Sequence, residues 1–284
     1  MAKTDGVIVR RMTRAEMDLA IGWAAEEGWN PGLNDAACFY AADPQGFFLA
    51  EEAGQPVGCL SAVAYDAHFA FAGFYMVRKA WRGRGIGSLL VREASAYLGS
   101  RTVGNDAVPA QQETYKKYGF ALAYRNVRYR GIAAPSAAGR SAGIVALDAV
   151  PFARLCAYDR ELFPAERPAF LECWIRQSGA TALGFVQEGR LAGYGVLRPC
   201  RQGWKVGPLF AVDEAIAEAL LAALNASIPG EEFFLDIPEP NPAARALVLR
   251  HGMAAVFETA RMYAGRIPEL PLERIFGVTS FELG

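Results

Sequence analysis

Histidine and cysteine, the residues that bind most transition metals, are scarce in this chain of 284 residues. Only His68 and His251 occur, so neither a zinc centre nor a Ser-His-Asp triad is expected. The five cysteines are odd in number and lack metal-type spacing; they are Cys38, Cys59, Cys156, Cys173 and Cys200. A reduced, cytoplasmic protein without a metal is the simplest interpretation of this usage.

Long runs of one residue type are absent as well. The chain carries 29 Lys and Arg against 30 Asp and Glu, with no long basic run, so a nucleic-acid partner is not expected. No apolar stretch reaches the roughly 20 residues of a membrane span, and the first residues lack a signal-peptide core. Because 52% of the residues are hydrophobic, we expect a globular protein of two domains of about 140 residues each.

The most informative segment that is present spans residues 74–98, FYMVRKAWRGRGIGSLLVREASAYL. Its pattern predicts an apolar strand, a tight Arg/Gly loop and an amphipathic helix. Glycines let the loop backbone approach a ligand closely. The free N–H groups and the positive dipole end of the helix point to the same place. This arrangement favours a bound pyrophosphate, with Arg82 and Arg84 adding positive charge.

Two other phosphate-binding loops begin in the same way but need residues that are missing here. A P-loop requires a lysine after its last glycine, and none follows Gly87. A Rossmann loop requires a third glycine, but Leu89 and Leu90 follow Ser88. What remains is the pattern R-x-x-G-x-G, and the alternative is a glycine-rich turn that only reverses the chain.

A second motif is the segment ETYKKYGF, residues 113–120. Gly119 suits the left-handed position after a helix, and Tyr115 lies four residues before it. A phenol is a suitable acid for a departing thiolate because its pKa lies somewhat above that of a thiol. The alternative is a half-buried tyrosine that packs on the sheet, which we expect of Tyr118.

Together these motifs resemble the GNAT superfamily of acyl-CoA-dependent N-acetyltransferases, whose loop reads Gln/Arg-x-x-Gly-x-Gly/Ala and whose later motif reads Y-x-x-x-G-F. The resemblance implies a mixed α/β sheet, acetyl-CoA as co-substrate without a metal, and Tyr115 as the acid that protonates the leaving CoA thiolate. The cofactor-binding residues that it implies are Tyr75, Met76, Val77, Arg82, Gly83, Arg84, Gly85, Ile86, Gly87 and Ser88. An asparagine often found seven residues before the tyrosine is Val108 here.

The chain also repeats itself at a spacing near 133 residues. The matched positions are Pro109 and Pro242, Ala110 and Ala243, Gly119 and Gly252, Ala121 and Ala254, and Arg128 and Arg261. Helix, glycine and strand follow in the same order in both halves, which indicates duplication. In the second copy AVDEAIAEA (211–219) replaces the Arg/Gly loop and Val248 replaces Tyr115.

The chain therefore resembles a group with two tandem GNAT-like domains, an active one and a degenerate one. We expect an N-acetyltransferase domain at 1–132 that binds acyl-CoA, a small-residue linker at 133–143, and a degenerate domain at 144–284 that covers the acceptor site. Local patterns predict a helix over 14–26 with Thr13 as its N-cap, a strand over 102–104 and one helix over 158–177.

The residue that removes the acceptor's proton is not evident. Many relatives place a glutamate on the strand before the loop, but residues 71–75 supply none. Asp106 is the first candidate, with a turn residue as the alternative, and His68 is the second. The resemblance places Glu27, Trp29 and Asn30 at the acceptor site, where acidic and aromatic groups suit a cationic amine; a solvated loop is the alternative.

The leading hypothesis is transfer of an acetyl or longer acyl group to the amine of a small molecule, by a monomer or homodimer. Two alternatives remain at this point: a non-catalytic acyl-CoA sensor, and a protein-lysine acetyltransferase with a more open groove.

Overall fold

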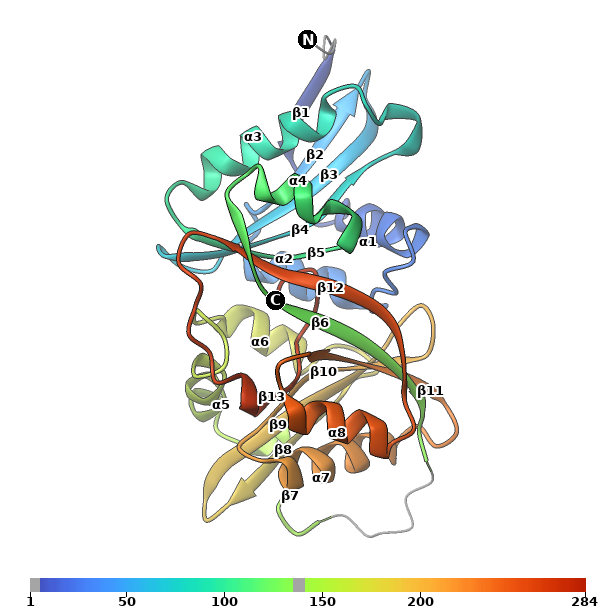
Figure 1. Ribbon diagram of the computed structural model, residues 1–284, viewed down its shortest axis with the longest axis vertical. Helices are drawn as coiled ribbons and strands as arrows, with labels where there is room; N and C mark the ends of the chain where they lie inside the picture. The colour runs from blue at the N-terminus through green and yellow to red at the C-terminus, as the bar shows by residue number, and fades with distance from the viewer. Residues whose placement is uncertain (1–5, 135–140) are drawn as a thin grey trace.

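The computed structural model describes residues 6–134 and 141–284 (Figure 1). The first half contains β1 (Val7–Arg11), α1 (Met17–Glu26), α2 (Asp35–Ala42), β2 (Phe47–Glu52), β3 (Gln55–Ala64), β4 (Phe69–Val77), α3 (Ile86–Leu98), β5 (Thr102–Ala107), α4 (Gln112–Lys116) and β6 (Phe120–Ile132). The second half contains β7 (Ile144–Ala146), α5 (Phe152–Arg160), α6 (Pro168–Trp174), β8 (Thr181–Gln187), β9 (Arg190–Pro199), β10 (Trp204–Ala211), α7 (Glu214–Asn225), β11 (Glu232–Pro238), α8 (Pro242–Arg250), β12 (Ala254–Ala264) and β13 (Ile275–Gly277). The mixed α/β class and the repeated order of elements are confirmed.

Three local predictions need correction. The helix expected over 158–177 is two helices, α5 and α6, because Pro164 disfavours helix in the residue before it and Pro168 starts a new one. Thr13 does not cap α1, which begins at Met17; its hydroxyl donates a hydrogen bond to Glu16 instead. Strand β5 continues to Ala107, so the strand predicted over 102–104 was too short.

The expected linker lies partly outside the described residues, since 135–140 are not described. Its first residue, Ala133, is buried and exchanges backbone hydrogen bonds with Gly230 and Glu231. The division of the chain into domains at 1–132 and 144–284 stays a prediction. In space the two halves are not separate.

A single sheet runs through both halves because one strand of each half, β6 and β12, pairs with strands of the other half. The sheet order is β1-β2-β3-β4-β5-β12-β6-β11-β10-β9-β8-β7, with β13 beside β10. Strand β12 of the second half pairs with β5 and β6, and β6 of the first half pairs with β11. Figure 1 shows β6 and β12 lying side by side across the middle of the molecule.

Two buried ion pairs join the exchanged strands to the opposite half. Arg128 of β6 donates to both oxygens of Asp236 on β11, at 2.7 and 2.8 Å. Arg261 of β12 donates to both oxygens of Asp106 on β5, at 3.0 and 2.7 Å. Burial would lower the pKa of Arg128, but the Asp236 carboxylate outweighs it and the pKa is raised. The duplicated arginines therefore form reciprocal contacts that hold the exchange in place.

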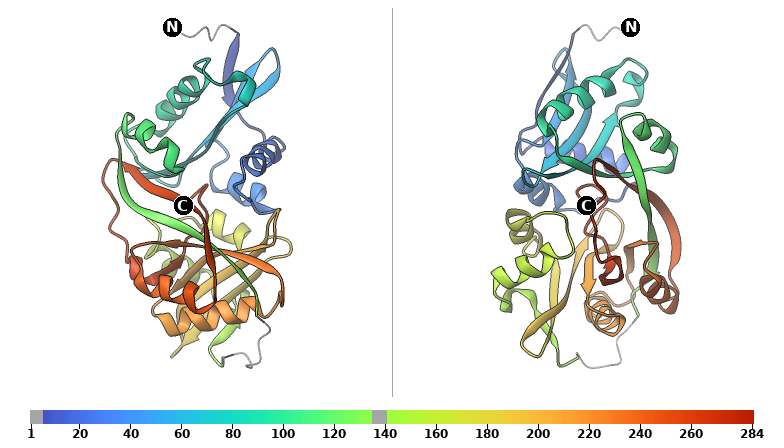
Figure 2. Two further views of the ribbon diagram at one scale, coloured as in Figure 1. Left: turned by 45° about the vertical axis from the view of Figure 1, so that its right-hand side comes forward. Right: turned by 60° about the vertical axis from the view of Figure 1, so that its left-hand side comes forward.

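The first-half sheet has helices on both faces, and two of its strands part near the middle. Helix α3 packs on one face and α1 and α2 on the other (Figure 2). Parallel strands β4 and β5 pair only as far as Ala72 and Asn105. Beyond that point Phe74 takes a φ of 45°, unusual for a bulky residue, at an irregularity in the pairing of β3 with β4. This splay opens the sheet for a site.

Among residues 6–134 and 141–284, no helix combines the length and apolar character needed to cross a bilayer. The same ranges hold no group of three His, Cys, Asp or Glu side chains placed to bind a metal ion.

Candidate active site

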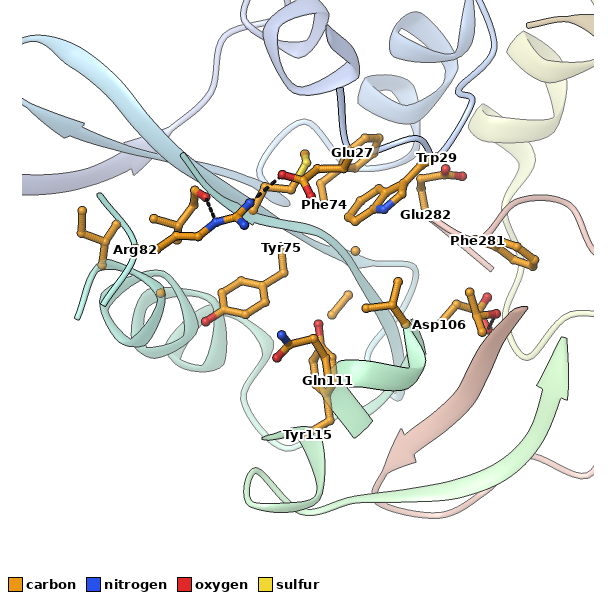
Figure 3. A pocket seen from close by; sticks show the side chains of 18 of the residues that line it. Glu27, Trp29, Phe74, Tyr75, Arg82, Asp106, Gln111, Tyr115, Phe281 and Glu282 are labelled. Atoms are coloured by element: carbon orange, nitrogen blue, oxygen red, sulfur yellow. Dashed lines mark hydrogen bonds and ion pairs between the residues drawn. The ribbon is translucent and has the colours of Figure 1, made fainter. Parts of the chain in front are cut away.

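A cavity of about 570 Å³ begins where β4 and β5 separate (Figure 3). It extends from the Arg/Gly loop, past Tyr115 on α4, to Trp29 and to the segment after β13. Its lining residues are Glu27, Trp29, Ala72, Gly73, Phe74, Tyr75, Met76, Val77, Trp81, Arg82, Gly83, Gly85, Ile86, Gly87, Ser88, Asp106, Val108, Gln111, Tyr115, Phe257, Thr259, Phe281 and Glu282. Both halves therefore contribute to one site.

The loop that starts α3 has the backbone that an anion-binding site needs. Gly83 and Gly85 have φ values of 77° and 84°, which other residues rarely adopt, and Gly85 directly precedes the helix. The unpaired N–H groups of the first turn thus belong to residues that line the cavity. Arg82 lies at the same end and donates to Glu27, at 2.6 Å, and to the Val77 carbonyl oxygen, at 2.8 Å.

Gly87 has a different task from the other two glycines. A Cβ atom at this position would lie 2.1 Å from the hydroxyl oxygen of Tyr75. The missing side chain therefore lets the Tyr75 ring cross from β4 to the start of α3. Tyr75 stands in the middle of the cavity, between the loop and Tyr115 (Figure 3).

Three of the residues considered for the site, Arg84, Asn30 and His68, do not line the cavity. Arg84 pairs with Glu52 at the end of β2, so its charge is already matched away from the cavity. Asn30 exchanges two hydrogen bonds with the backbone of Gln202, at 2.8 and 2.9 Å, and so fastens its loop to the second half. His68 lies in the exposed turn before β4, also outside the lining.

Tyr115 projects from α4 into the cavity and is half-buried. Its ring contacts those of Tyr75 and Phe120 edge-on, with centroids 6.4 and 5.6 Å away. Burial raises the pKa of the Tyr115 phenol above its ordinary value. The hydroxyl therefore keeps its proton through the neutral pH range and can act as a donor.

Asp106 lines the cavity, but its carboxylate is already engaged. Besides the two bonds from Arg261, it accepts one from Asn126 at 2.8 Å and a longer one from Thr259 at 3.4 Å. Asp236 on β11 of the second half is paired with Arg128 in the same way, although the second half has neither the Arg/Gly loop nor a counterpart of Tyr115. The hydrogen bonds from Arg261, Asn126 and Thr259 hold the Asp106 carboxylate where β5, β6 and β12 meet.

A second carboxylate at the cavity, Glu282, is not indicated by any motif in the sequence. Only 4% of this residue is exposed, it lines the cavity, and a Cβ atom added to Gly73 of β4 would lie 2.2 Å from its carbonyl oxygen. Tyr115 and Glu282 stand on different walls (Figure 3). No local pattern places residue 282 beside residue 73, because the two are brought together only by the packing of the whole chain.

Among residues 6–134 and 141–284, no side chain forms a hydrogen bond or ion pair with the Glu282 carboxylate. Burial raises its pKa, and the charges of Lys205 and Arg128 oppose that effect. Both cations are committed elsewhere: Arg128 to Asp236 and the Trp29 carbonyl oxygen, and Lys205 to the Asn30 carbonyl oxygen at 2.9 Å. The other charged neighbours, Asp35 and Arg198, pair with each other. A buried carboxylate in this state binds a proton more strongly than an exposed one.

The second half lacks the corresponding anion site. Asp213 occupies the start of α7 and accepts a hydrogen bond from the Ile216 N–H at 2.9 Å, which fills the position of an anion. Val248, which replaces Tyr115, is fully buried in the core. The degenerate half therefore lines part of the cavity but does not provide a second anion-binding loop.

Comparisons with known proteins agree with this geometry. A sequence model of the acetyltransferase (GNAT) domain matches residues 43–122, and another of the same description matches residues 155–277. The holothin acyltransferase of Pseudoalteromonas sp. (strain SANK 73390) is 32% identical over 272 residues, which cover 95% of this chain and 92% of that protein.

Solved structures show the same architecture. A candidate acetyltransferase from Pyrococcus horikoshii has a TM-score of 0.83 and 25% identity, covering 100% of this chain and 98% of the other. A tandem GNAT protein from the clavulanic acid biosynthesis pathway shares the fold, with a TM-score of 0.62, 16% identity and coverage of 92% and 100%. The chain belongs to the GNAT acetyltransferase family. Within it, this protein is an acyltransferase with two tandem GNAT domains.

Proposed function

We propose that the protein transfers an acyl group from acyl-CoA to the amine of a small molecule. The observation that carries this proposal is that one cavity joins a helix start suited to a pyrophosphate, a protonated tyrosine and an unpartnered carboxylate.

We call the loop at residues 82–85 and the first turn of α3 the anion cradle; it fits the diphosphate of the donor. Its negative charge matches the N–H groups of the loop and of the first turn of α3. Arg82, now paired with Glu27 in an exposed position, can exchange that carboxylate for a phosphate at small cost. Met76 and Val77 lie in the part of β4 that pairs with β3 but no longer with β5. Their backbone holds the pantetheine arm of the donor, and the Val77 N–H polarises the thioester oxygen.

The proton transfers fall to two side chains. The Tyr115 hydroxyl gives its proton to the sulfur as the carbon–sulfur bond breaks. Glu282 takes the proton that the amine loses as the carbon–nitrogen bond forms, directly or through one water. The two steps balance, because one proton enters the products at sulfur and one leaves at nitrogen.

The acceptor end of the cavity suits a compact, partly aromatic or cationic amine. Its walls include Trp29, Phe257 and Phe281, with Glu282 as the facing charge. Because residues 281 and 282 of the second half line this end of the cavity, we expect a small molecule to fit better than a lysine on a protein. Holothin, the acceptor named for the Pseudoalteromonas relative, is the first compound to test.

The test is release of free thiol from acetyl-CoA and longer acyl-CoAs in the presence of holothin and a panel of small amines. We expect thiol release that depends on both the donor and one class of amine, with the N-acyl product seen by mass spectrometry. If CoA binds but no amine of the panel gives turnover, the protein is instead an acyl-CoA sensor. If only lysines on proteins are acylated, it is a protein-lysine acetyltransferase.

A further inference from the structure

A second cavity of about 340 Å³ adjoins the first on the face of the sheet that carries α3. The two cavities share Ala72, Gly73, Tyr75 and Tyr115. Ala72, Gly73 and Tyr75 lie at the point where β4 and β5 separate, and Tyr115 is the tyrosine proposed to protonate the sulfur. The second cavity therefore begins at the place where the transferred carbon must lie.

The lining of this cavity is mainly apolar. Its apolar side chains are Leu60, Ala72, Val91, Ala94, Leu98, Val103, Phe120 and Ala264, with the rings of Tyr75, Tyr115 and Tyr118. Two of the lining residues, Ala72 on β4 and Ala94 on α3, have small side chains that leave space between the strand and the helix.

The one charged residue at the rim does not require a charged ligand. Arg101 donates to the carbonyl oxygens of Asp66, at 2.6 Å, and of Leu98, at 2.8 Å. A cavity whose only cation is satisfied in this way favours an aliphatic occupant over an anion.

The second cavity and the proposed diphosphate site contact different parts of α3. The anion cradle lies at Gly85 and Ile86, whereas the second cavity contacts the helix from Val91 to Leu98. A donor with its diphosphate at the helix start and its sulfur beside Tyr115 leaves the second cavity for the group attached to the reacting carbon.

We propose that this second cavity binds the aliphatic chain of the acyl group, so that the preferred donors are acyl-CoAs with chains longer than acetyl. The proposal rests on the proposed function, because it assigns the chain of that same donor. Each methylene that leaves water for this cavity contributes about 0.8 kcal/mol, or about fourfold in kcat/KM. The gain stops when the chain reaches the far end of the cavity, near Gly99 and Gly265.

The first experiment measures binding without turnover. Calorimetry compares CoA, acetyl-CoA and octanoyl-CoA on the full chain. We expect octanoyl-CoA to bind at least tenfold more tightly than acetyl-CoA, with a more negative heat-capacity change from burial of apolar surface. Equal affinities and heat capacities for the two thioesters would overturn the acyl-chain site while leaving the proposed function intact. Failure of all three ligands to bind would overturn both.

The second experiment blocks the cavity. Val91→Phe places a ring in the lining, and Ala96→Phe is its control on the exposed side of the same helix. We expect Val91→Phe to reduce kcat/KM for octanoyl-CoA by at least tenfold while acetyl-CoA changes by less than threefold. Ala96→Phe should change neither. If Val91→Phe affects both donors equally, or neither, the chain does not lie in this cavity.

Discussion

At the scale of single residues, Glu282 stands out because burial raises its pKa and no described residue provides it with a dedicated partner. A base works only when it is deprotonated, so kcat/KM should fall as the pH drops through the raised pKa of this carboxyl group. Glu282→Gln should lower kcat by about 100-fold and remove that acidic limb of the pH profile.

The control for this change is Glu273→Gln, an exposed glutamate in the same C-terminal segment, which should leave both rate and profile unchanged. A Glu282→Gln enzyme that keeps the wild-type rate and acidic limb would show that another group accepts the proton.

Tyr115 is tested by removing only its hydroxyl. Tyr115→Phe keeps the ring contacts with Tyr75 and Phe120 and should lower kcat by about 100-fold with donor affinity unchanged, because the leaving sulfur loses its acid. Tyr129→Phe, on β6 and outside the lining of both cavities, is the matched control. Equal rates for the two variants would leave Tyr115 with a packing role only.

These residues also show what local sequence could and could not predict about the site. The spacing between Tyr115 and Gly119 is local, and the structure places Tyr115 in the cavity as the motif predicts. Arg84 does not line the cavity, and a motif cannot reveal that Glu52, from another strand, binds its guanidinium. Glu282 was missed for the same reason, since its contact with Gly73 joins residues far apart in the chain.

At the scale of elements, the start of α3 decides whether the donor binds. Gly85→Ala forces a side chain into a φ of 84° and should cost about 1–2 kcal/mol of stability. It should also weaken CoA binding by at least tenfold, because the first-turn N–H groups shift.

Gly54→Ala is the matched control for backbone strain. Gly54 has a φ of 77° in the turn between β2 and β3, outside the cavity lining. It should cost similar stability, measured by urea unfolding, without loss of CoA affinity by calorimetry. Equal loss of affinity in both variants would mean that the loop acts only through global stability.

Element positions were largely predictable, because periodicity and turn residues act over a few positions. Helix α3 lies where the pattern of residues 74–98 places a helix. The break between α5 and α6 was signalled by Pro164 and Pro168, a local cue that apolar periodicity concealed. The partner of each strand is not a local property, so the exchange of β6 and β12 could not be read from spacing.

At the scale of the whole molecule, the exchanged strands make the two halves depend on each other. Arg261→Met leaves Asp106 buried without its cation and should lower the free energy of unfolding by about 3–5 kcal/mol. The double variant Asp106→Asn/Arg261→Met should recover part of that loss, because no unpaired charge remains.

The double variant also tests the role of Asp106. If its task is architectural, the folded double variant keeps an acidic limb in its pH profile and a kcat within about tenfold of the wild type. Loss of that limb, together with a 100-fold fall in kcat, would restore Asp106 as the proton acceptor.

We expect one half to carry the acyl-CoA cradle and the other to complete the cavity without a cradle of its own. Titration calorimetry of the intact protein with CoA measures how many cradles there are. We expect one binding site per chain, weakened at least tenfold in Gly85→Ala and retained in Asp213→Asn at the start of α7. Two sites per chain, or no heat of binding at all, would contradict this expectation.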